Sequence, residues 1–284
     1  LLTQSEVDQL VEGLDALSKE VEEGTITISD EFEDVHSKKE YELTKTYGDI
    51  GKNIHTARSR NDQVLAAMQL YLKDEIQEIK QLVKALFEQY MTLADRYNDQ
   101  LLPGYTHLQI AMPSSFGLWF SAYAEILADE VLLLNTVHTL CDQNPLGSAA
   151  GYGSSFPIDR HDTTATLGFD TLKYNVVAAQ MSRGKLEKNL AQAIGSLAGT
   201  LSRFSMDVCL YMNQNFDFIS FPDDITTGSS IMPHKKNPDV FELIRGKCNK
   251  LQALPNELAM MGTNLPSGYH REMQLFKGPI MQAI

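Results

Sequence analysis

The most constraining feature of the sequence is a long, regularly spaced apolar seam between residues 68 and 97. Apolar side chains recur there at alternating steps of four and three, at Met68, Leu72, Ile76, Ile79, Val83, Leu86, Tyr90, Leu93 and Tyr97. This spacing is typical of one α-helix that buries a single stripe. At a rise of about 1.5 Å per residue the helix is on the order of 50 Å long. Because it needs neighbours of similar length, it predicts an elongated helical bundle.

Other stretches of the sequence repeat this spacing and supply candidate neighbours. Two further seams consist of Phe116, Phe120, Tyr123, Leu127, Val131 and Leu134, and of Leu186, Leu190, Ala193, Leu197, Leu201, Phe204, Val208 and Tyr211. A last one covers residues 240–254, and Pro255 is expected to kink or end its helix. Gly195 and Gly199 cost helix stability but permit close helix contact. Alternating strand patterns are few, so the predicted fold class is all-α, an elongated long-helix bundle.

Shorter helices are expected outside these seams. Thr3 and Glu6 have the spacing of a capping box, and another helix is expected to open at residues 33–36. A third is expected to start near Asp159, after an irregular, glycine- and serine-rich stretch at 145–155.

The organisation predicted from these patterns has three parts. Residues 1–60 are interpreted as the remainder of an N-terminal helical domain, residues 61–262 as the central long-helix bundle, and residues 263–284 as the start of a truncated C-terminal segment. The sequence begins without Met and stops within a pattern at Ile284. We therefore expect the chain to be part of a longer polypeptide.

Composition excludes several classes of protein. The 284 residues carry a net charge of −13, which argues against non-specific nucleic-acid binding. No apolar run approaches the roughly 20 residues that span a bilayer, so no membrane partner is expected. The cysteines, Cys141, Cys209 and Cys248, lack the spacing of a disulfide framework or a zinc site. Reduced thiols in a cytoplasmic protein are predicted.

Polar residues gather in separate stretches, each beside a predicted helix end. These stretches are Arg58, Ser59, Arg60, Asn61 and Asp62; Thr106 and His107; the loop at 226–239; and Tyr269, Arg271, Gln274 and Lys277. Each stretch alone is more typical of a solvated loop or a structural histidine than of a site. Together they offer hydroxyls, an imidazole, cations and amides, which suit proton abstraction next to a carboxylate. They contain no metal-ligand spacing and no nucleotide-binding fingerprint, so neither a metal nor a cofactor is expected.

The loop carries the most specific pattern. Residues 228–238 read Gly-Ser-Ser-Ile-Met-Pro-His-Lys-Lys-Asn-Pro, with Pro233 stiffening the chain, and resemble the signature of the fumarase/aspartase superfamily. Within that superfamily, residues 33–36, 56–64 and 104–109 resemble the argininosuccinate lyases in particular. The resemblance implies reversible anti β-elimination of argininosuccinate to arginine and fumarate, without a cofactor.

The resemblance also implies roles for individual residues. Ser229 matches the catalytic base, His107 the acid or part of its proton relay, and Glu242 the carboxylate that pairs with this histidine from another subunit. Lys235 and Asn237 match positions that bind a substrate carboxylate. The remaining matches are substrate contacts, with Arg60 close by: Ser59, Asn61, Thr106, Tyr269, Gln274 and Lys277.

The family resemblance further implies a homotetramer whose active sites each draw residues from three subunits. Two departures stand out. The segment at 175–188, which contains Met-Ser-Arg-Gly-Lys at 181–185, differs from the Arg-Asp pattern of the family and could alter a subunit contact or the mouth of the site. We also expect the given sequence to lack the family's extra N-terminal segment and its C-terminal domain. The alternatives are a sister lyase, such as adenylosuccinate lyase, and a catalytically silent, crystallin-like structural protein.

Overall fold

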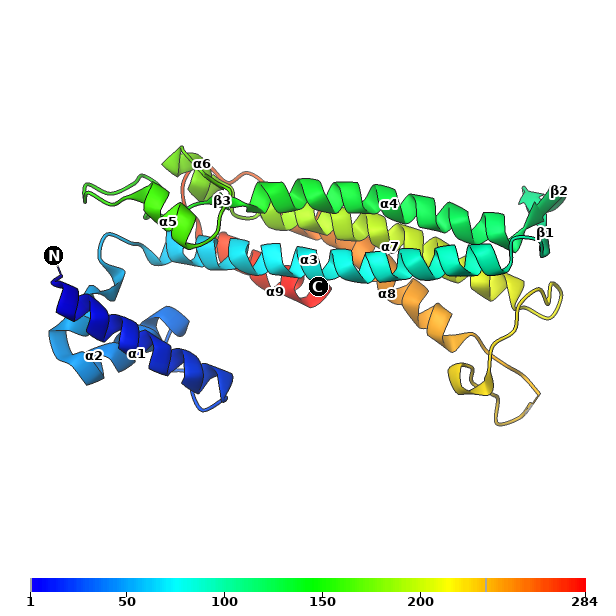
Figure 1. The fold of residues 1–284 in the computed structure, drawn as a ribbon, viewed down its shortest axis with the longest axis horizontal. Helices are drawn as coiled ribbons and strands as arrows, with labels where there is room; N and C mark the ends of the chain where they lie inside the picture. Colours follow the sequence, from blue (N-terminus) through cyan, green and yellow to red (C-terminus); the bar gives the residue numbers. More distant parts are fainter. Residues whose placement is uncertain (1, 233) are drawn as a thin grey trace.

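The computed structural model describes residues 2–232 and 234–284 of the chain. The long helices lie side by side as an elongated bundle (Figure 1): α3 (Arg60–Arg96), α4 (Phe116–Cys141), α7 (Lys185–Tyr211) and α8 (Asp239–Met261). With 37 residues, α3 is about 55 Å long. The predicted all-α, long-helix fold is confirmed.

The seams face the bundle interior as expected. Buried side chains of α3 include Met68, Leu72, Ile76, Val83 and Tyr90, and those of α7 include Leu186, Leu190, Ala193, Leu197 and Val208. One core cluster joins these helices to α4 and α8, and a second, rich in aromatic rings, fills the bundle further along. Burying each large apolar side chain stabilises the fold by roughly 1.5–3 kcal/mol.

Pro255 does not end its helix, because α8 continues to Met261. Leu254 and Leu258, on either side of the proline, are buried against the core and hold the helix in place. A Cβ on Gly195 of α7 would lie 3.5 Å from Cγ of Pro255, an ordinary van der Waals distance, so the contact between α7 and α8 there does not require a glycine. Of the two outcomes expected at Pro255, a kink or an end of the helix, the end is wrong.

A β-hairpin at one end of the bundle was not expected from the sequence. β1 (Leu101–Thr106) pairs antiparallel with β2 (Gln109–Ser115), with Pro103 opposite Pro113. The sequence shows no alternating pattern there, because β2 is mostly exposed and β1 contains Pro103 and Gly104. The connecting turn is His107–Leu108, and both residues have positive φ, 53° and 59°.

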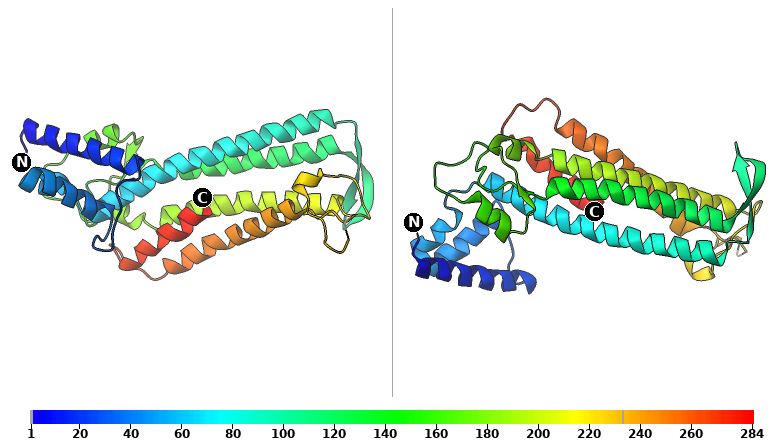
Figure 2. Two further views of the ribbon diagram at one scale, coloured as in Figure 1. Left: turned by 90° about the horizontal axis from the view of Figure 1, so that it is seen from below. Right: turned by 45° about the horizontal axis from the view of Figure 1, so that its top comes forward.

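Smaller elements cover the opposite end, where α3 begins. α1 (Gln4–Glu22), α2 (Val35–Tyr47) and η1 (Gly48–His55) form a lobe beside it (Figures 1 and 2). The other small elements are β3 (Gln143–Asn144), α5 (Arg160–Thr166), β4 (Thr171–Leu172), α6 (Val176–Met181), η3 (Arg271–Phe276) and α9 (Lys277–Ala283). A further one, η2 (Asp223–Ile225), lies at the end with the hairpin (Figure 1).

Their caps agree with the sequence. The capping box between Thr3 and Glu6 is present, and Asp159 caps α5 by accepting from the amides of His161 and Asp162. In the described part of the chain, no helix combines the length and apolarity that crossing a membrane requires.

Candidate active site

The predicted site residues divide between the two ends of the bundle (Figures 1 and 2). We call these the α3-start end and the hairpin end. The α3-start end has Ser59, Arg60, Asn61, Tyr269, Gln274 and Lys277, on the first turn of α3 and around η3 and α9. The hairpin end has Thr106, His107, Ser229, Lys235, Asn237 and Glu242, on the hairpin, the 226–239 loop and the first turn of α8.

At the α3-start end, Ser59 caps the helix. Its Oγ accepts from the amide of Asn61 at 3.2 Å, and its own amide donates to Asp62 at 2.9 Å. The second carboxylate oxygen of Asp62 accepts from the amides of Gly147 and Ala149, at 3.0 and 2.9 Å. Asp62 is completely buried, so it fixes the glycine-rich loop against the start of α3. Sequence reasoning did not single it out, although it follows the matched Asn61.

Arg60 is held by acidic residues rather than left free. It pairs with Glu33, lies 3.4 Å from Asp34, and donates to Ser37 at 3.1 Å. Glu33 also accepts from Arg271 at 3.3 Å, which ties the start of α2 to η3. These contacts support a role for Arg60 in ordering the site.

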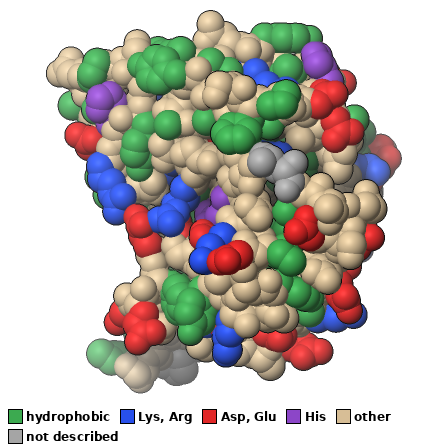
Figure 3. All heavy atoms as spheres, turned by 90° about the vertical axis from the view of Figure 1, so that its left-hand side faces the viewer, with side chains coloured by type: hydrophobic (Ala, Val, Ile, Leu, Met, Phe, Trp, Pro, Cys, Tyr) green, Lys and Arg blue, Asp and Glu red, His purple; other side chains and the backbone are tan. Residues whose placement is uncertain are grey.

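Two histidines and a lysine of α2 and η1 lie at this end of the bundle. Burial lowers the pKa of His36, His55 and Lys39, since each would carry its charge in a poorly hydrated place. Gln63 lies 2.8 Å from Nδ1 of His55 and fixes that ring. Figure 3 looks onto this end and shows basic, acidic and histidine side chains close together at mid-height on that face.

Tyr269, Gln274 and Lys277 come together beside a residue that prediction missed. Nη2 of Arg183 donates to Oε1 of Gln274 at 3.0 Å, and Nε2 of Gln274 donates to the hydroxyl of Tyr269 at 2.8 Å. Burial, and then the charge of Arg183, lower the pKa of Lys277, and Asp34 opposes them. Arg183 belongs to the segment at 175–188, whose departure from the family pattern was the only signal in the sequence.

At the hairpin end, the signature loop is closed at its base. Thr227 and Asn237 exchange backbone hydrogen bonds of 3.3 and 2.8 Å. Within the loop, Oγ of Ser229 accepts from the amides of Ile231 and Met232, each at 3.3 Å. Lys235 is exposed, whereas Pro233, expected to stiffen the loop, lies outside the described residues. Amide donors directed at a hydroxyl oxygen stabilise negative charge on it.

His107, Thr106 and Glu242 are exposed. Within residues 2–232 and 234–284, none of their side chains makes a hydrogen bond or ion pair, so the pair expected between His107 and Glu242 is not formed inside one chain. The hairpin around His107 also exposes apolar side chains, namely Leu101, Leu108, Ile110 and Met112.

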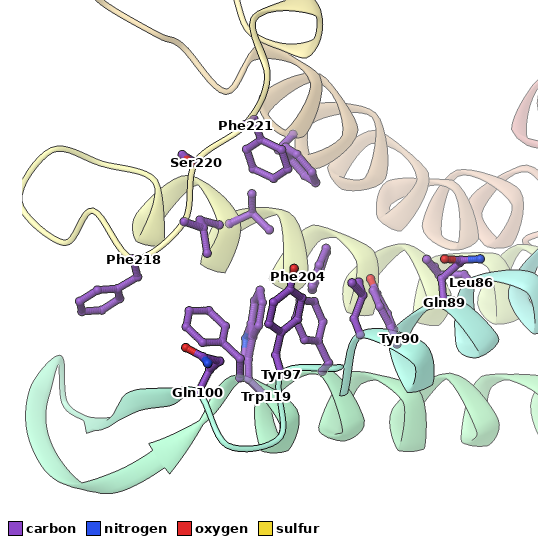
Figure 4. A pocket seen from close by; sticks show the side chains of 16 residues that line it. Leu86, Gln89, Tyr90, Tyr97, Gln100, Trp119, Phe204, Phe218, Ser220 and Phe221 are labelled. Atoms are coloured by element: carbon purple, nitrogen blue, oxygen red, sulfur yellow. The ribbon is translucent and has the colours of Figure 1, made fainter. Parts of the chain in front are cut away.

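A cavity of about 650 Å³ lies between α3, α4, α7 and the segment at 218–221 (Figure 4). Its lining is mainly aromatic and has no charged side chain: Leu86, Gln89, Tyr90, Leu93, Tyr97, Gln100, Phe116, Trp119, Phe120, Phe204, Val208, Phe218, Ile219, Ser220, Phe221 and Phe241. It contains none of the predicted site residues. Without a cation, it is unsuited to an anionic substrate.

Among the side chains that the structure describes, no three His, Cys, Asp or Glu are grouped as metal ligands would be. The predicted site residues at the two ends instead carry hydroxyls, amides, cations, an imidazole and, in Glu242, one carboxylate. These groups can bind carboxylates and transfer protons.

Comparison with known proteins defines the class. The family model described as "Lyase" matches residues 1–253, and the chain belongs to this family, within the fumarase/aspartase superfamily. The argininosuccinate lyase of Bacteroides thetaiotaomicron is 56% identical over 283 residues, which are 100% of this chain and 64% of that protein. The argininosuccinate lyase of Xylella fastidiosa is 43% identical over 99% of this chain and 63% of its own length. The chain thus spans less than two thirds of these relatives.

Solved structures show the same fold at low sequence identity. EDDS lyase in complex with formate superimposes with a TM-score of 0.88 at 23% identity, covering 99% of this chain and 57% of that one. A class II fumarase from Schistosoma mansoni gives a TM-score of 0.72 at 18% identity, covering 86% and 58%.

Proposed function

We propose that the whole protein is a carbon–nitrogen lyase of arginine biosynthesis that converts argininosuccinate reversibly to L-arginine and fumarate. The observation that carries this proposal is the 56% identity, over 100% of this chain, to an argininosuccinate lyase. The separate clusters of hydroxyls, amides and cations support it, because the substrate carries carboxylates at both ends.

The proposed reaction needs a base and an acid on opposite sides of the bond that breaks. Ser229 removes the proton from the carbon next to the retained carboxylate, and the amides of Ile231 and Met232 stabilise the charge on its oxygen. The electron pair forms an aci-carboxylate, which Lys235 and Asn237 stabilise. The carbon–nitrogen bond then breaks, and His107, paired with Glu242, protonates the leaving guanidinium nitrogen.

We also propose that the protein is cytoplasmic and that it assembles as a homotetramer. The exposed apolar hairpin supports it, since Leu101 is 81% and Ile110 73% exposed, and apolar surface of this kind is typical of contacts between copies. The distribution of predicted residues over both ends of a helix about 55 Å long supports sites shared between subunits. The α3-start end of one copy would meet the hairpin and the loop of others.

Fumarate formation from argininosuccinate by the full-length protein, followed by absorbance, tests the activity. We expect turnover on argininosuccinate and none on adenylosuccinate. Turnover on adenylosuccinate alone would assign the chain to the sister lyases. Absence of turnover on both would favour a silent structural protein.

Mixing two inactive variants tests whether sites are shared. Ser229→Ala and His107→Asn chains are each expected to lose about 99% of their activity or more, and unfolding and refolding them together is expected to restore activity well above either level. Recovery follows only if some sites take both intact residues from different copies. A doubly substituted chain mixed with Ser229→Ala is the control and should stay inactive. Failure of the first mixture to recover would contradict shared sites.

A further inference from the structure

The hydrogen bonds from Arg183 have a fixed direction. An arginine guanidinium carries only donors, so the atom of Gln274 that faces it must be the amide oxygen. The amide nitrogen of Gln274 then faces Tyr269 and donates to its hydroxyl oxygen, at 2.8 Å. Because that oxygen already accepts this hydrogen bond, the hydroxyl hydrogen of Tyr269 is left to point at a further acceptor. Arg183 thereby makes Tyr269 a donor.

The surroundings of Arg183 favour an anion as that acceptor. Arg183 is only 4% exposed, and its Nε and Nη1 have no hydrogen-bond partner in the described part of the chain. The nearby carboxylate of Glu187 accepts instead from the amide of Gly184, at 2.6 Å. Burial lowers the pKa of both Arg183 and Lys277, and the negative charges of Glu187 and Asp34, respectively, oppose this shift. A bound carboxylate would compensate both charges further.

We propose that Arg183 is a positioning residue that orients Gln274 and Tyr269 so that Tyr269 and Lys277 bind the carboxylate of the amino-acid half of the substrate. This rests on the proposed function. That half is indicated because the loop with Ser229, which carries the proposed chemistry, brings its own carboxylate ligands, Lys235 and Asn237. Through Arg183, the segment at 175–188 that departs from the family pattern therefore acts on substrate binding.

The reverse reaction reports on the two halves of argininosuccinate separately, because arginine and fumarate then bind as different substrates, each with its own KM. In the full-length protein, Arg183→Met removes the donor that orients Gln274. We expect KM for arginine to rise by about 10- to 100-fold, as for a lost hydrogen bond to a charged group, while KM for fumarate stays within about twofold. Arg183→Lys, which restores a donor, should recover part of this loss. Lys185→Met, an exposed neighbour with the same change of charge, should leave both KM values unchanged.

Tyr269→Phe keeps the ring and guards against a folding defect in Arg183→Met. It should raise KM for arginine similarly, and the double variant should be no worse than either single one, since both remove the same donor. Agmatine, which is arginine without its carboxylate, should lose no affinity in these variants.

Different results would overturn the proposal. An unchanged KM for arginine in Arg183→Met, a rise for fumarate alone, or an equal rise for both substrates with a lowered thermal midpoint would each do so. If the wild-type protein itself makes no fumarate from argininosuccinate, the proposed function fails instead. The two failures are therefore distinguishable.

Discussion

The two ends of the bundle differ in how their polar side chains are satisfied. At the α3-start end, Asp62, Arg60 and Gln274 have partners on other elements of the same chain, and several of these side chains are partly or fully buried. At the hairpin end, His107 and Glu242 are exposed, and the hydrogen bonds of Ser229 stay within its own loop. One end is held together by contacts within the chain, and the other leaves its polar groups exposed.

This difference separates two kinds of substitution. Changes at the hairpin end should affect chemistry with little effect on the stability of the chain, because few contacts inside the chain are lost. Changes at the α3-start end should affect stability as well, because buried donors and charges lose their partners. Four substitutions test this difference between the two ends.

Ser229→Ala should have the largest effect. Loss of the proposed base should lower kcat by about 10³-fold or more, equivalent to about 4 kcal/mol of transition-state stabilisation. The thermal midpoint and the mass of the assembly should not change. Steady-state kinetics with argininosuccinate and light scattering on the same preparation check both statements. Near-normal kcat would remove Ser229 from the role of base.

His107→Asn should lower kcat by about 10²-fold, or about 3 kcal/mol, because the proposed acid is lost. Asparagine tolerates positive φ, so the hairpin turn should persist. The pH profile of kcat should lose the limb that the imidazole contributes. A fall in kcat with an unchanged profile would show that His107 does not handle a proton in the slow step.

Asp62→Asn should destabilise the chain by about 2 kcal/mol, because an amide cannot accept from the backbone at both of its ends. Urea unfolding measures this loss as a shift in midpoint at constant slope. Asp49→Asn is the matched control, since the Asp49 side chain is 92% exposed, and should shift the free energy of unfolding by no more than about 0.5 kcal/mol. Equal effects of both changes would remove the contrast between the ends.

His36→Gln should have the smallest effect, and it depends on pH. The folded chain lowers the pKa of His36 from its usual value, so it binds fewer protons than the unfolded chain. The contribution of neutral His36 to the free energy of unfolding is therefore fully present above a pH of about 6.5. It is lost as the pH falls through the lower pKa that His36 has in the folded chain. Thermal midpoints between pH 8 and 5 should fall less steeply in the variant. Exposed His161→Gln, the control, should keep the wild-type slope.

Periodicity was enough to predict the long helices, because their buried stripes are written directly into the spacing of apolar residues. It placed the first seam residue at Met68, whereas α3 begins at Arg60 through the cap of Ser59. The start was missed because capping polar residues carry no apolar period. The hairpin was missed because β2 is mostly exposed and β1 contains Pro103 and Gly104, so neither strand shows alternation.

The site was predictable only where a residue type carries its own chemistry. Ser229 and His107 were found through their motifs, and their roles stay predictions, as does the division at residues 60 and 262. Arg183 could not be assigned, because its importance arises from burial and from a contact with Gln274, 91 residues away. No local pattern encodes such a contact.

The hairpin turn has a consequence for how this sequence can change over time. Positive φ at two successive residues favours asparagine and glycine, and any other residue there gives up stability, by roughly 1 kcal/mol or more for each position. His107 and Leu108 both occupy such positions. Glycine in place of Leu108 would therefore relieve part of this cost, whereas the same change at His107 would also remove the imidazole to which the proposed function assigns a proton transfer. Fewer stabilising changes are thus open to the turn at His107 than at Leu108.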